Sequence, residues 1–380
     1  MSIRKVLVTG GAGFIGSHLI PKILGLGMEV RVLDILSPQV HQSIPSGLEW
    51  MQTSGIEFMR GSVTLREDWE RALVGVEGVV HLAAETGTGQ SMYEVARYNE
   101  VNSQGTALMF DVLGRTAGCG VKRVVLSSSR SVYGEGAYCC PECNDKRVFP
   151  VARSVLALEN GQWEPVCPQC SGVLQLTATK ETDQVSPASI YAATKYAQED
   201  LVRIGCQALG IGFAICRLQN VYGERQSLNN PYTGILSIFS TKVRRGTELP
   251  LFEDGLESRD FVHVDDVTDA LVQCLMVGTS PNTIINVGSG VATSVTAVAR
   301  ELSLAFGVQP KLIVTGQFRV GDIRHNFADI ERMKDLLGLQ PKINLEAGLK
   351  RFAAWVEQEP LPEDRLEQAN EELRRRKLMN

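Results

Sequence analysis

Short apolar runs alternate with longer segments of helical spacing through the first half of the chain. The runs that predict strands lie at residues 5–9, 29–34, 56–60, 78–82, 123–128 and 212–218. Between them, apolar residues recur every three or four positions over residues 14–26, 99–117 and 191–209, as in a helix with one buried face. Strands that alternate with helices favour a parallel sheet covered on both faces, so the pattern predicts a doubly wound α/β domain.

The pattern becomes looser after residue 222, where Asn229, Asn230, Pro231 and Gly255 indicate loops. Shorter strands are predicted near residues 258–264, 283–287 and 311–314. We therefore expect a first domain over residues 1–222. Residues 223–358 should form mainly a smaller lobe that packs over the carboxyl ends of the main sheet. Residues 359–380 form a charged helical tail with an acidic start and a basic end, which we interpret as a solvated or dimer-flanking helix.

Composition narrows the class of partner. The chain has 380 residues, of which 44% are hydrophobic and 21% charged, values typical of a globular protein with a substantial core. A formal net charge of -5 argues against nucleic acid or an anionic membrane as the main partner. The N-terminus enters a strand at once, without a signal peptide or a long apolar run. We therefore expect a cytoplasmic location.

A glycine turn follows the first strand. Gly10, Gly13 and Gly16 form G-x-x-G-x-x-G where the first helix begins. The first glycine permits a tight turn, the second lets the backbone approach a pyrophosphate, and the third allows close packing of helix on sheet. Asp34 ends the second strand, where a carboxylate accepts hydrogen bonds from ribose hydroxyls and repels a 2′-phosphate. The sequence therefore predicts a Rossmann-type domain that binds NAD rather than NADP.

A tyrosine and a lysine follow at helical spacing. Tyr191 and Lys195 are four residues apart and share one face of the predicted helix. An ammonium near a phenol lowers the pKa of the phenol, as a general base requires, and a lysine can also hold the nicotinamide ribose. Such a pair also occurs on exposed helix faces. Here it follows the dinucleotide turn and a strand that ends in three serines, at residues 127–129, so we interpret it as catalytic.

Together these motifs resemble the extended short-chain dehydrogenases/reductases, which include the nucleotide-sugar epimerases and dehydratases. The resemblance extends from residue 5 to about residue 355. The motifs that carry it are TGGAGFIG (9–16), HLAA (81–84), VNSQGT (101–106), LSSSRSVYG (126–134), YAATK (191–195), RLQNVYG (217–223), SRDFVHVDD (258–266), NVGSG (286–290) and RVGDIRH (319–325). It implies a Rossmann sheet with a C-terminal substrate lobe, a nucleotide-diphosphate sugar as substrate, and a homodimer.

The resemblance also implies roles for individual residues. Tyr191 would be the general acid/base, Lys195 would tune it, and Ser129 would bind the reacting oxygen. The implied cofactor contacts are Gly10, Gly13, Phe14, Ile15, Gly16, Asp34, Ile35, Ser62, Val63, Leu82, Ala83, Ala84, Asn102, Tyr191 and Lys195. The implied substrate contacts are Thr86, Ser129, Arg130, Asn220, Arg259 and Arg319, since the planar arginine fork suits a diphosphate.

Some positions depart from the family pattern or carry no predicted role. Ser62 follows Gly61 where the family often has an acid, so the adenine contact should be weakened or replaced. We interpret three of the histidines and four of the cysteines as structural. These are His18, His81, His263, Cys119, Cys206, Cys216 and Cys274.

The residues that follow the strand end at residue 129 differ between family members that catalyse different reactions. Family dehydratases carry Thr-Asp-Glu there, whereas this chain has Ser129-Arg130-Ser131 without a carboxylate. Dehydration is therefore disfavoured, and the resemblance implies a 4-epimerase that oxidises and re-reduces the sugar with NAD. Residues 35–41, residues 84–91 and a cysteine-rich insert resemble the bacterial enzymes that convert dTDP-L-rhamnose to dTDP-6-deoxy-L-talose.

Three alternatives remain open from the sequence. One is a 4-keto reductase or dehydrogenase that acts on a nucleotide sugar. The second is an epimerase that acts on a UDP-hexose or a UDP-uronic acid. The third is a non-catalytic Rossmann protein, against which the Ser129, Tyr191 and Lys195 set argues.

Residues 138–172 form an insert between Ser129 and Tyr191. They contain Cys140-Pro-Glu-Cys143 and Cys167-Pro-Gln-Cys170, two C-x-x-C pairs with 23 residues between them. This spacing predicts a tetrahedral zinc site, which would leave no position open for substrate and would therefore be structural. The alternative is four free thiols on a loop, which would be an oxidation liability. Cys139 has no predicted role.

Overall fold

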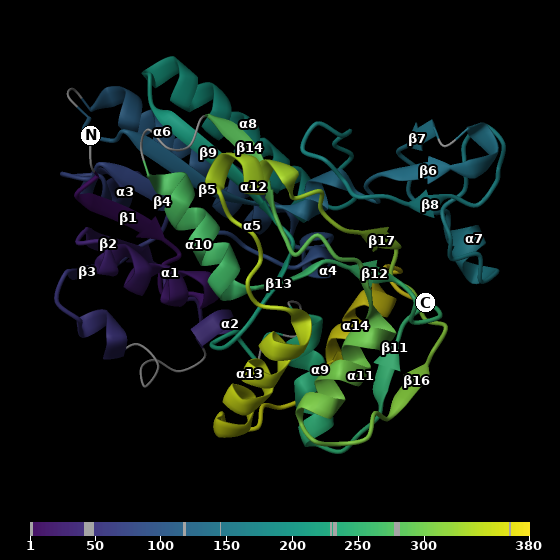
Figure 1. Cartoon of the computed structure of the whole chain (residues 1–380). Coiled ribbons are helices and arrows are strands. Elements are labelled where there is room, and N and C mark those ends of the chain that lie inside the picture. Colours follow the sequence, from purple (N-terminus) through teal and green to yellow (C-terminus); the bar gives the residue numbers. More distant parts are fainter. Residues whose placement is uncertain are drawn as a thin grey trace.

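The computed structural model describes residues 3–41, 49–116, 119–144, 146–228, 230, 234–276, 282–364 and 366–380. Figure 1 shows a main body around a large sheet, a lobe built from later segments, and a small three-stranded unit that projects at one end of the molecule. None of the helices in these ranges has the length and apolar character needed to cross a membrane.

The main sheet has seven parallel strands in the order β14-β9-β5-β4-β1-β2-β3. In chain order they are β1 (Lys5–Thr9), β2 (Glu29–Asp34), β3 (Ile56–Arg60), β4 (Gly78–His81), β5 (Arg123–Ser129), β9 (Gly212–Leu218) and β14 (Thr283–Val287). Apolar residues dominate them, as expected where helices cover both faces. The predicted doubly wound α/β fold is confirmed, and the strands end together at one carboxyl edge.

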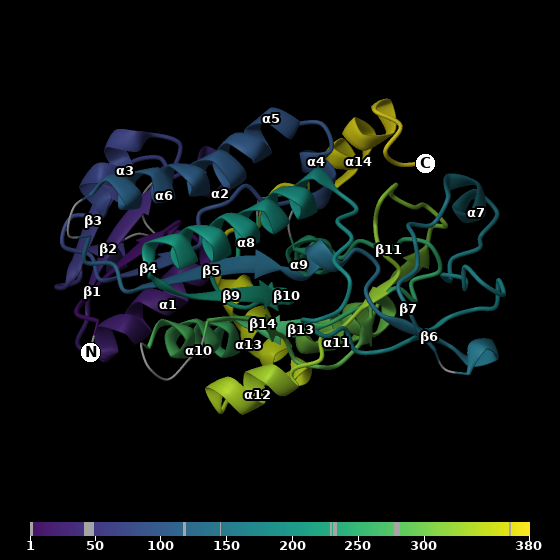
Figure 2. The ribbon, with the colours of Figure 1, turned by 90° about the horizontal axis from the view of Figure 1, so that it is seen from above.

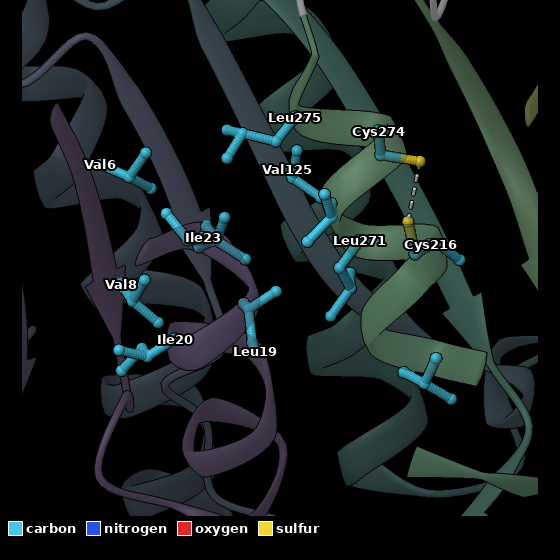
Figure 3. Close-up of a cluster of buried hydrophobic side chains, with 14 of the residues drawn as sticks. Val6, Val8, Leu19, Ile20, Ile23, Val125, Cys216, Leu271, Cys274 and Leu275 are labelled. Carbon is cyan, nitrogen blue, oxygen red and sulfur yellow. Dashed lines mark hydrogen bonds between the residues drawn. The ribbon is translucent and has the colours of Figure 1, made fainter. Parts of the chain in front are cut away.

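Helices pack on both faces of this sheet (Figure 2). On one face lie α1 (Phe14–Gly25) and α10 (Val264–Leu275), and on the other lie α3 (Arg66–Ala72), α6 (Gly105–Arg115) and α8 (Ile190–Leu209). Figure 3 shows the first of these layers, where side chains of α1 and α10 meet β1 and β5, and Cys216 lies 3.6 Å from Cys274. Both cysteines are fully buried, as is Cys206, whereas Cys119 is partly exposed.

Two helices that matter for the site have well-defined ends. The side chain of Ser189 accepts a hydrogen bond from the backbone N–H of Ala192 and so caps α8, and Gly210 ends the helix with φ of 68°. The helix predicted from residue 99 begins instead with a π-helical turn, η2 (Asn99–Gln104), before α6. Such turns often occur at functional sites. The predicted end of this helix at residue 117 lies outside the described residues.

The second lobe is built mainly from residues after 222. Its helices and strands are β10 (Asn220–Tyr222), α9 (Ile235–Arg244), β11 (Leu249–Leu251), β12 (Ser258–Arg259), β13 (Phe261–His263), β15 (Thr293–Ser294), α11 (Val295–Ala305), β16 (Leu312–Val314), β17 (His325–Asn326) and α13 (Leu345–Gln358). Two segments of residues 223–358 lie with the first domain, because α10 packs on the main sheet and β14 pairs with β9. A local pattern does not show which sheet a strand joins.

The insert forms a small sheet of its own. It contains β6 (Tyr138–Cys140), β7 (Lys146–Val148) and α7 (Val155–Glu159), and β6 pairs antiparallel with β7 and with β8 (Gln175–Leu176), which directly follows the insert. Its buried cluster is limited to Tyr138, Cys140, Cys167 and Leu174 among the described residues. A core of this size is too small to be stable without another source of folding energy.

The tail differs from the prediction. Helix α14 (Leu366–Arg375) buries Leu366, Ala369, Asn370 and Leu373 against the rest of the molecule, and the last residues pair with the loop at Arg319. It is therefore not solvated on all sides. The remaining short helical segments are α2 (Pro38–His41), η1 (Glu49–Gln52), α4 (Thr88–Ser91), α5 (Val95–Tyr98), η3 (Arg130–Tyr133), η4 (Pro141–Cys143) and α12 (Glu331–Leu337).

Candidate active site and metal centre

A cavity of about 770 Å³ follows the carboxyl edge of the sheet from the glycine turn to Tyr191. Gly10 has φ of 66°, and a Cβ there would lie 2.7 Å from the backbone nitrogen of Ala83. A Cβ at Gly16 would lie 2.3 Å from the carbonyl oxygen of Gly11. Neither position leaves room for a side chain. The glycines are therefore needed where the turn meets the end of β4 and where α1 packs on the turn.

Asp34 ends β2 and is held by the backbone on both sides. Its carboxylate accepts hydrogen bonds from the N–H of Ala12 (3.0 Å) and the N–H of Leu36 (2.8 Å), and only 8% of the residue is exposed. His41 lies nearby, where burial lowers its pKa and the charge of Asp34 opposes that effect. A fixed carboxylate at the cavity wall is suited to binding ribose hydroxyls.

The turn after β3 is organised by an acid that the sequence analysis missed. The carboxylate of Asp68, in the first turn of α3, accepts a hydrogen bond from the N–H of Ser62 at 2.7 Å. A Cβ at Gly61 would also meet this carboxylate at 2.7 Å. Ser62 itself pairs with the hydroxyl of Thr64 at 2.8 Å. An acid is thus present beside this turn, six residues after Ser62, but it holds the backbone.

Most of the predicted cofactor residues, and some of the predicted substrate residues, line this cavity. They are Gly10, Gly13, Phe14, Ile15, Gly16, Asp34, Ile35, Ser62, Val63, Leu82, Ala83, Ala84, Thr86, Ser129, Arg130, Tyr191 and Asn220. Lys195 and Asn102 are instead 2% and 0% exposed, and lie behind the wall. Asn102 bonds to both the N–H and the C=O of Glu85 and to the hydroxyl of Thr194, so it joins the loop after β4 to α8.

Ser129 and Tyr191 meet where β5 ends and α8 begins. The hydroxyl of Ser129 accepts hydrogen bonds from the N–H of Ser131 (3.2 Å) and its hydroxyl (3.0 Å). Burial raises the pKa of Tyr191, while a hydrogen bond with Ser129 and the charge of Arg130 oppose the rise. Burial lowers the pKa of Lys195 to about 7. Among the described groups, Ser129 and Arg130 therefore favour the phenolate form of Tyr191.

Tyr98 supports Tyr191 and the loop that faces it. Its ring stands edge-on to Tyr191 with centroids 6.4 Å apart, and its hydroxyl donates to the carbonyl oxygens of Thr86 (2.5 Å) and Gly87 (3.0 Å). The 86–90 loop is thereby held over the cavity. Tyr98 precedes the VNSQGT motif by three residues, and neither its spacing nor its type predicts this role.

A second cavity of about 250 Å³ adjoins the first and shares Thr88, Arg130 and Asn220 with it. The predicted substrate residues Arg259 and Arg319 line it. The guanidinium of Arg130 donates to the side-chain oxygen of Asn220 at 2.9 Å, and burial together with Arg259 lowers the pKa of Arg130 to about 10.

Acidic and apolar residues complete this cavity. Asp322 accepts a hydrogen bond from Arg259 at 3.1 Å, and the positive charges around it keep its pKa low despite burial. Ile235, Ile238 and Phe252, together with Phe318, supply an apolar wall. Asp322 was overlooked although it lies within the RVGDIRH motif.

The tail closes one side of the second cavity. Leu366, Leu373 and Leu378 line it, and the side-chain oxygen of Asn370 accepts a hydrogen bond from Arg319 at 3.0 Å. Arg319 also lies over the ring of Phe252, 4.7 Å from its centroid. No spacing rule predicts that a charged terminal helix would reach this site.

The four cysteines of the two C-x-x-C pairs come together as predicted. Their sulfur atoms all lie within 4.8 Å of one another, which compares with roughly 3.8 Å for thiolates around a tetrahedral zinc. The N–H of Gln169 donates to Cys167 and that of Gly172 to Cys170. Each pair is followed by a residue in the left-handed region, Asn144 at φ 55° and Ser171 at φ 62°. The donor set fits one zinc ion, and Cys139 lies outside it.

The histidines have structural partners. His81 is buried between Thr9 and Thr106, and burial lowers its pKa to about 3. His18 contacts Asp265, and His263 contacts Glu224 and Asp265. Neither cavity includes any of the three.

Comparisons with known proteins agree with this site. Residues 6–154 and 166–288 match the model of the NAD dependent epimerase/dehydratase family. The dTDP-L-rhamnose 4-epimerase of Burkholderia thailandensis is 38% identical over 94% of this chain and 96% of its own length. Among solved structures, UDP-glucose 4-epimerase from Thermotoga maritima, with UDP-glucose, is 29% identical at a TM-score of 0.74 and covers 93% of this chain and 99% of its own.

A third relative was solved with a nicotinamide cofactor. MoeE5, in complex with UDP-glucuronic acid and NAD, is 27% identical at a TM-score of 0.73, again over 93% of this chain and 99% of its own. The glycine turn, the Ser129–Tyr191 pair and these matches agree. The chain belongs to the NAD-dependent epimerase/dehydratase family of nucleotide-sugar enzymes.

Proposed function

We propose that the chain is a nucleotide-sugar 4-epimerase that converts dTDP-L-rhamnose to dTDP-6-deoxy-L-talose. The observation that carries the reaction type is the end of β5, where Ser129, Arg130 and Ser131 stand beside Tyr191 without a carboxylate. The nearby Glu135 is 5% exposed and bound by Arg153, so it is not free to move protons at C5 or C6. The Burkholderia relative supports the choice of sugar nucleotide.

The chain's own residues would move the proton and hold the sugar. Tyr191 would remove the proton of the C4 hydroxyl as the C4–H bond breaks, and return it once the keto sugar has turned over. Ser129 would donate a hydrogen bond to the reacting oxygen, and Lys195 would support Tyr191 from behind the cavity wall. NAD, when bound, would supply the hydride acceptor and donor. The diphosphate would lie among Arg130, Arg259 and Arg319.

Two other activities use the same geometry. A 4-keto reductase or dehydrogenase would need the same Ser129 and Tyr191 but would exchange its cofactor at each turnover. An epimerase that acts on a UDP-hexose or a UDP-uronic acid is supported by the similarity to the two solved structures described above, which contain UDP-glucose and UDP-glucuronic acid. The family also suggests a homodimer, and Tyr196, Ile204 and Leu209 on α8 are exposed apolar residues available for one.

The product distinguishes these reactions. Purified protein without added cofactor should convert dTDP-L-rhamnose to a product of unchanged mass with inverted configuration at C4, measured by mass spectrometry and NMR. A product lighter by one water, or NADH released in proportion to sugar, would refute epimerisation. Conversion of UDP-glucose in preference to the dTDP sugar would refute the proposed substrate.

Tyr191→Phe should lower kcat by about a hundredfold or more, because the ring stays and the ionisable hydroxyl is lost. Steady-state kinetics with the nucleotide sugar would measure this. Tyr196→Phe is the matched control on the same helix, since Tyr196 is 37% exposed, and it should keep its activity. Near-normal turnover by Tyr191→Phe would rule out the assigned base.

We also propose NAD as the resident dinucleotide, on the basis of Asp34. Asp34→Ala should weaken NAD binding by about tenfold, because it removes a charged hydrogen-bond acceptor. It should also reduce the preference of the protein for NAD over NADP. Mass spectrometry of the nucleotide released on denaturation, with fluorescence titration of the variants, would test both points. Glu29→Ala, at the exposed start of β2, is the control. NADP in the wild-type protein would contradict the proposal.

We propose further that Cys140, Cys143, Cys167 and Cys170 bind one structural zinc. Four thiolates would complete a tetrahedral shell, and the metal would supply folding energy that the insert's small core lacks. The cluster geometry supports this, as does the pair of equivalent turns that follow the two C-x-x-C pairs.

Cys167→Ser should lose the metal and loosen the insert, and should weaken sugar-nucleotide binding while the first domain keeps its dinucleotide. Elemental analysis should find about one zinc per chain in the wild type and in the control Cys139→Ser, and much less in Cys167→Ser. Less than about half a zinc per wild-type chain after metal-replete expression would show that the cysteines serve another purpose.

A further inference from the structure

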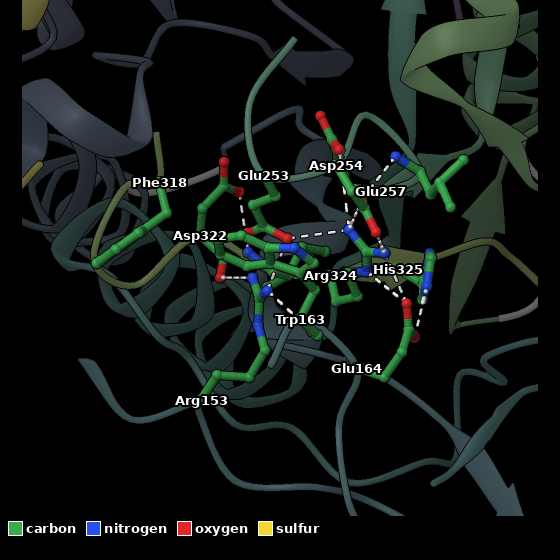
Figure 4. A network of polar contacts seen from close by, with 12 residues as sticks. Arg153, Trp163, Glu164, Glu253, Asp254, Glu257, Phe318, Asp322, Arg324 and His325 are labelled. Carbon is green, nitrogen blue, oxygen red and sulfur yellow. Dashed lines mark hydrogen bonds and ion pairs between the residues drawn. The ribbon is translucent and has the colours of Figure 1, made fainter. Parts of the chain in front are cut away.

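The insert takes part in a cluster of charged side chains beside the second cavity, shown in Figure 4. At its centre is Arg324, which is fully buried. Its guanidinium donates to Glu164 of the insert (2.6 Å) and to Asp254 (2.7 Å) and Glu253 (3.0 Å) of the second lobe. The cluster is therefore a bridge between two parts of the chain that are far apart in sequence.

Arg153 is the second cation of the cluster and belongs to the insert. Its side chain is 4% exposed and donates to Glu253 at 2.8 Å and to Glu135 at 3.2 Å. It also donates to the backbone carbonyl oxygens of Asp322 (3.0 Å) and Trp163 (3.1 Å). One insert residue thus contacts two buried carboxylates and the loop that carries Asp322.

Glu253 is the residue through which Arg153 reaches the substrate region. It lines the second cavity, and its backbone has a left-handed φ of 49°, so the turn sets the position of its carboxylate. Its other described cationic neighbour is Arg324, and Glu257 is an acidic neighbour on the same cavity wall. Without Arg153, the negative charge of Glu253 would be only partly balanced.

The charge of this wall matters because the proposed substrate carries a diphosphate. Among the described residues that line the second cavity, three are arginines and three are acids. They are Arg130, Arg259, Arg319, Glu253, Glu257 and Asp322. If the acids were all ionised and unpaired, they would cancel the arginines. Arg153 and Arg324, which lie behind the wall, offset the negative charge of Glu253, and this offset favours the binding of an anion.

We propose that Arg153 is an electrostatic positioning residue for nucleotide-sugar binding, supplied by the cysteine insert to neutralise Glu253 at the wall of the second cavity. It would act without touching the substrate, and it would hold the Asp322 loop in place through its backbone contact. This inference rests on the proposed function, because it needs the diphosphate in the second cavity. The insert would then affect the affinity for the nucleotide sugar and would have no role in hydride transfer.

The test is a charge-compensation experiment on NAD-loaded protein with dTDP as the probe, measured by calorimetry. Arg153→Gln should weaken dTDP binding by about tenfold, since it removes a charged hydrogen-bond partner of a buried acid. It should raise KM for the nucleotide sugar by a similar factor while kcat and bound NAD stay nearly unchanged. Arg153→Lys should retain most of the affinity because it keeps the charge.

Removing the negative charge of Glu253 should restore dTDP binding to the Arg153→Gln protein. The double variant Arg153→Gln/Glu253→Gln should recover most of the lost dTDP affinity, and Glu253→Gln alone should bind dTDP at least as tightly as the wild type. The single Glu253 variant also keeps the proposal testable if Arg153→Gln fails to fold. Arg147→Gln is the matched control, because Arg147 is an insert arginine paired with Asp183 away from both cavities.

Several results would overturn the inference. They are unchanged dTDP affinity in Arg153→Gln, no recovery in the double variant, an equal loss in Arg147→Gln, or a fall in kcat instead of a rise in KM. A failure of the proposed function would look different. In that case the wild-type protein itself would neither bind dTDP or UDP nor act on a nucleotide sugar.

Discussion

The parallel register of the main sheet is the constraint on which the site depends. Because β1 pairs with β2 and β4, and β5 lies between β4 and β9, the turns after these strands meet at one edge. The glycine turn follows β1, and Asp34 and Ser129 are the last residues of β2 and β5. Helix α8 brings Tyr191 to the same edge. Gly10 and Ala83 approach each other closely at this edge, and only glycine leaves enough room there. Residues distant in sequence therefore form one cavity.

Buried charged side chains are the second organising feature, and Arg217 and Glu199 form a buried ion pair. Arg217 and Glu199 are each 2% exposed and lie 2.7 Å apart beneath the active site, with Arg217 over the ring of Tyr133. Glu199 is one turn along α8 from Lys195 and also accepts a hydrogen bond from Ser128, so it ties the catalytic helix to β5 and β9. A buried charge that loses its partner is strongly destabilising, which makes this pair a structural requirement of the helix position.

The insert and the tail both contact segments that line the second cavity. Glu164 and Arg153 of the insert reach the second lobe, and Trp163 packs near Phe318 with ring centroids 6.3 Å apart. The tail brings Asn370 to Arg319 and three leucines to the wall. Both segments lie outside the motifs that the family resemblance rests on. The second cavity is thus shaped in part by segments other than those that form the glycine turn and carry Ser129 and Tyr191.

Local patterns determined much of this protein. The apolar runs predicted the strands, because a buried strand is a continuous run of apolar residues. The G-x-x-G and C-x-x-C spacings predicted the turn and the cysteine cluster, and the Tyr-x-x-x-Lys spacing placed Tyr191 and Lys195 on one helix. Tertiary structure alone decided the rest. β14 joins the first sheet although it follows the second lobe, and Asp68, Tyr98 and Asp322 reach the site through contacts between distant segments. The charge environment of Tyr191 and Glu253 also depends on burial and on neighbours such as Arg130 and Arg153, which no spacing along the chain specifies.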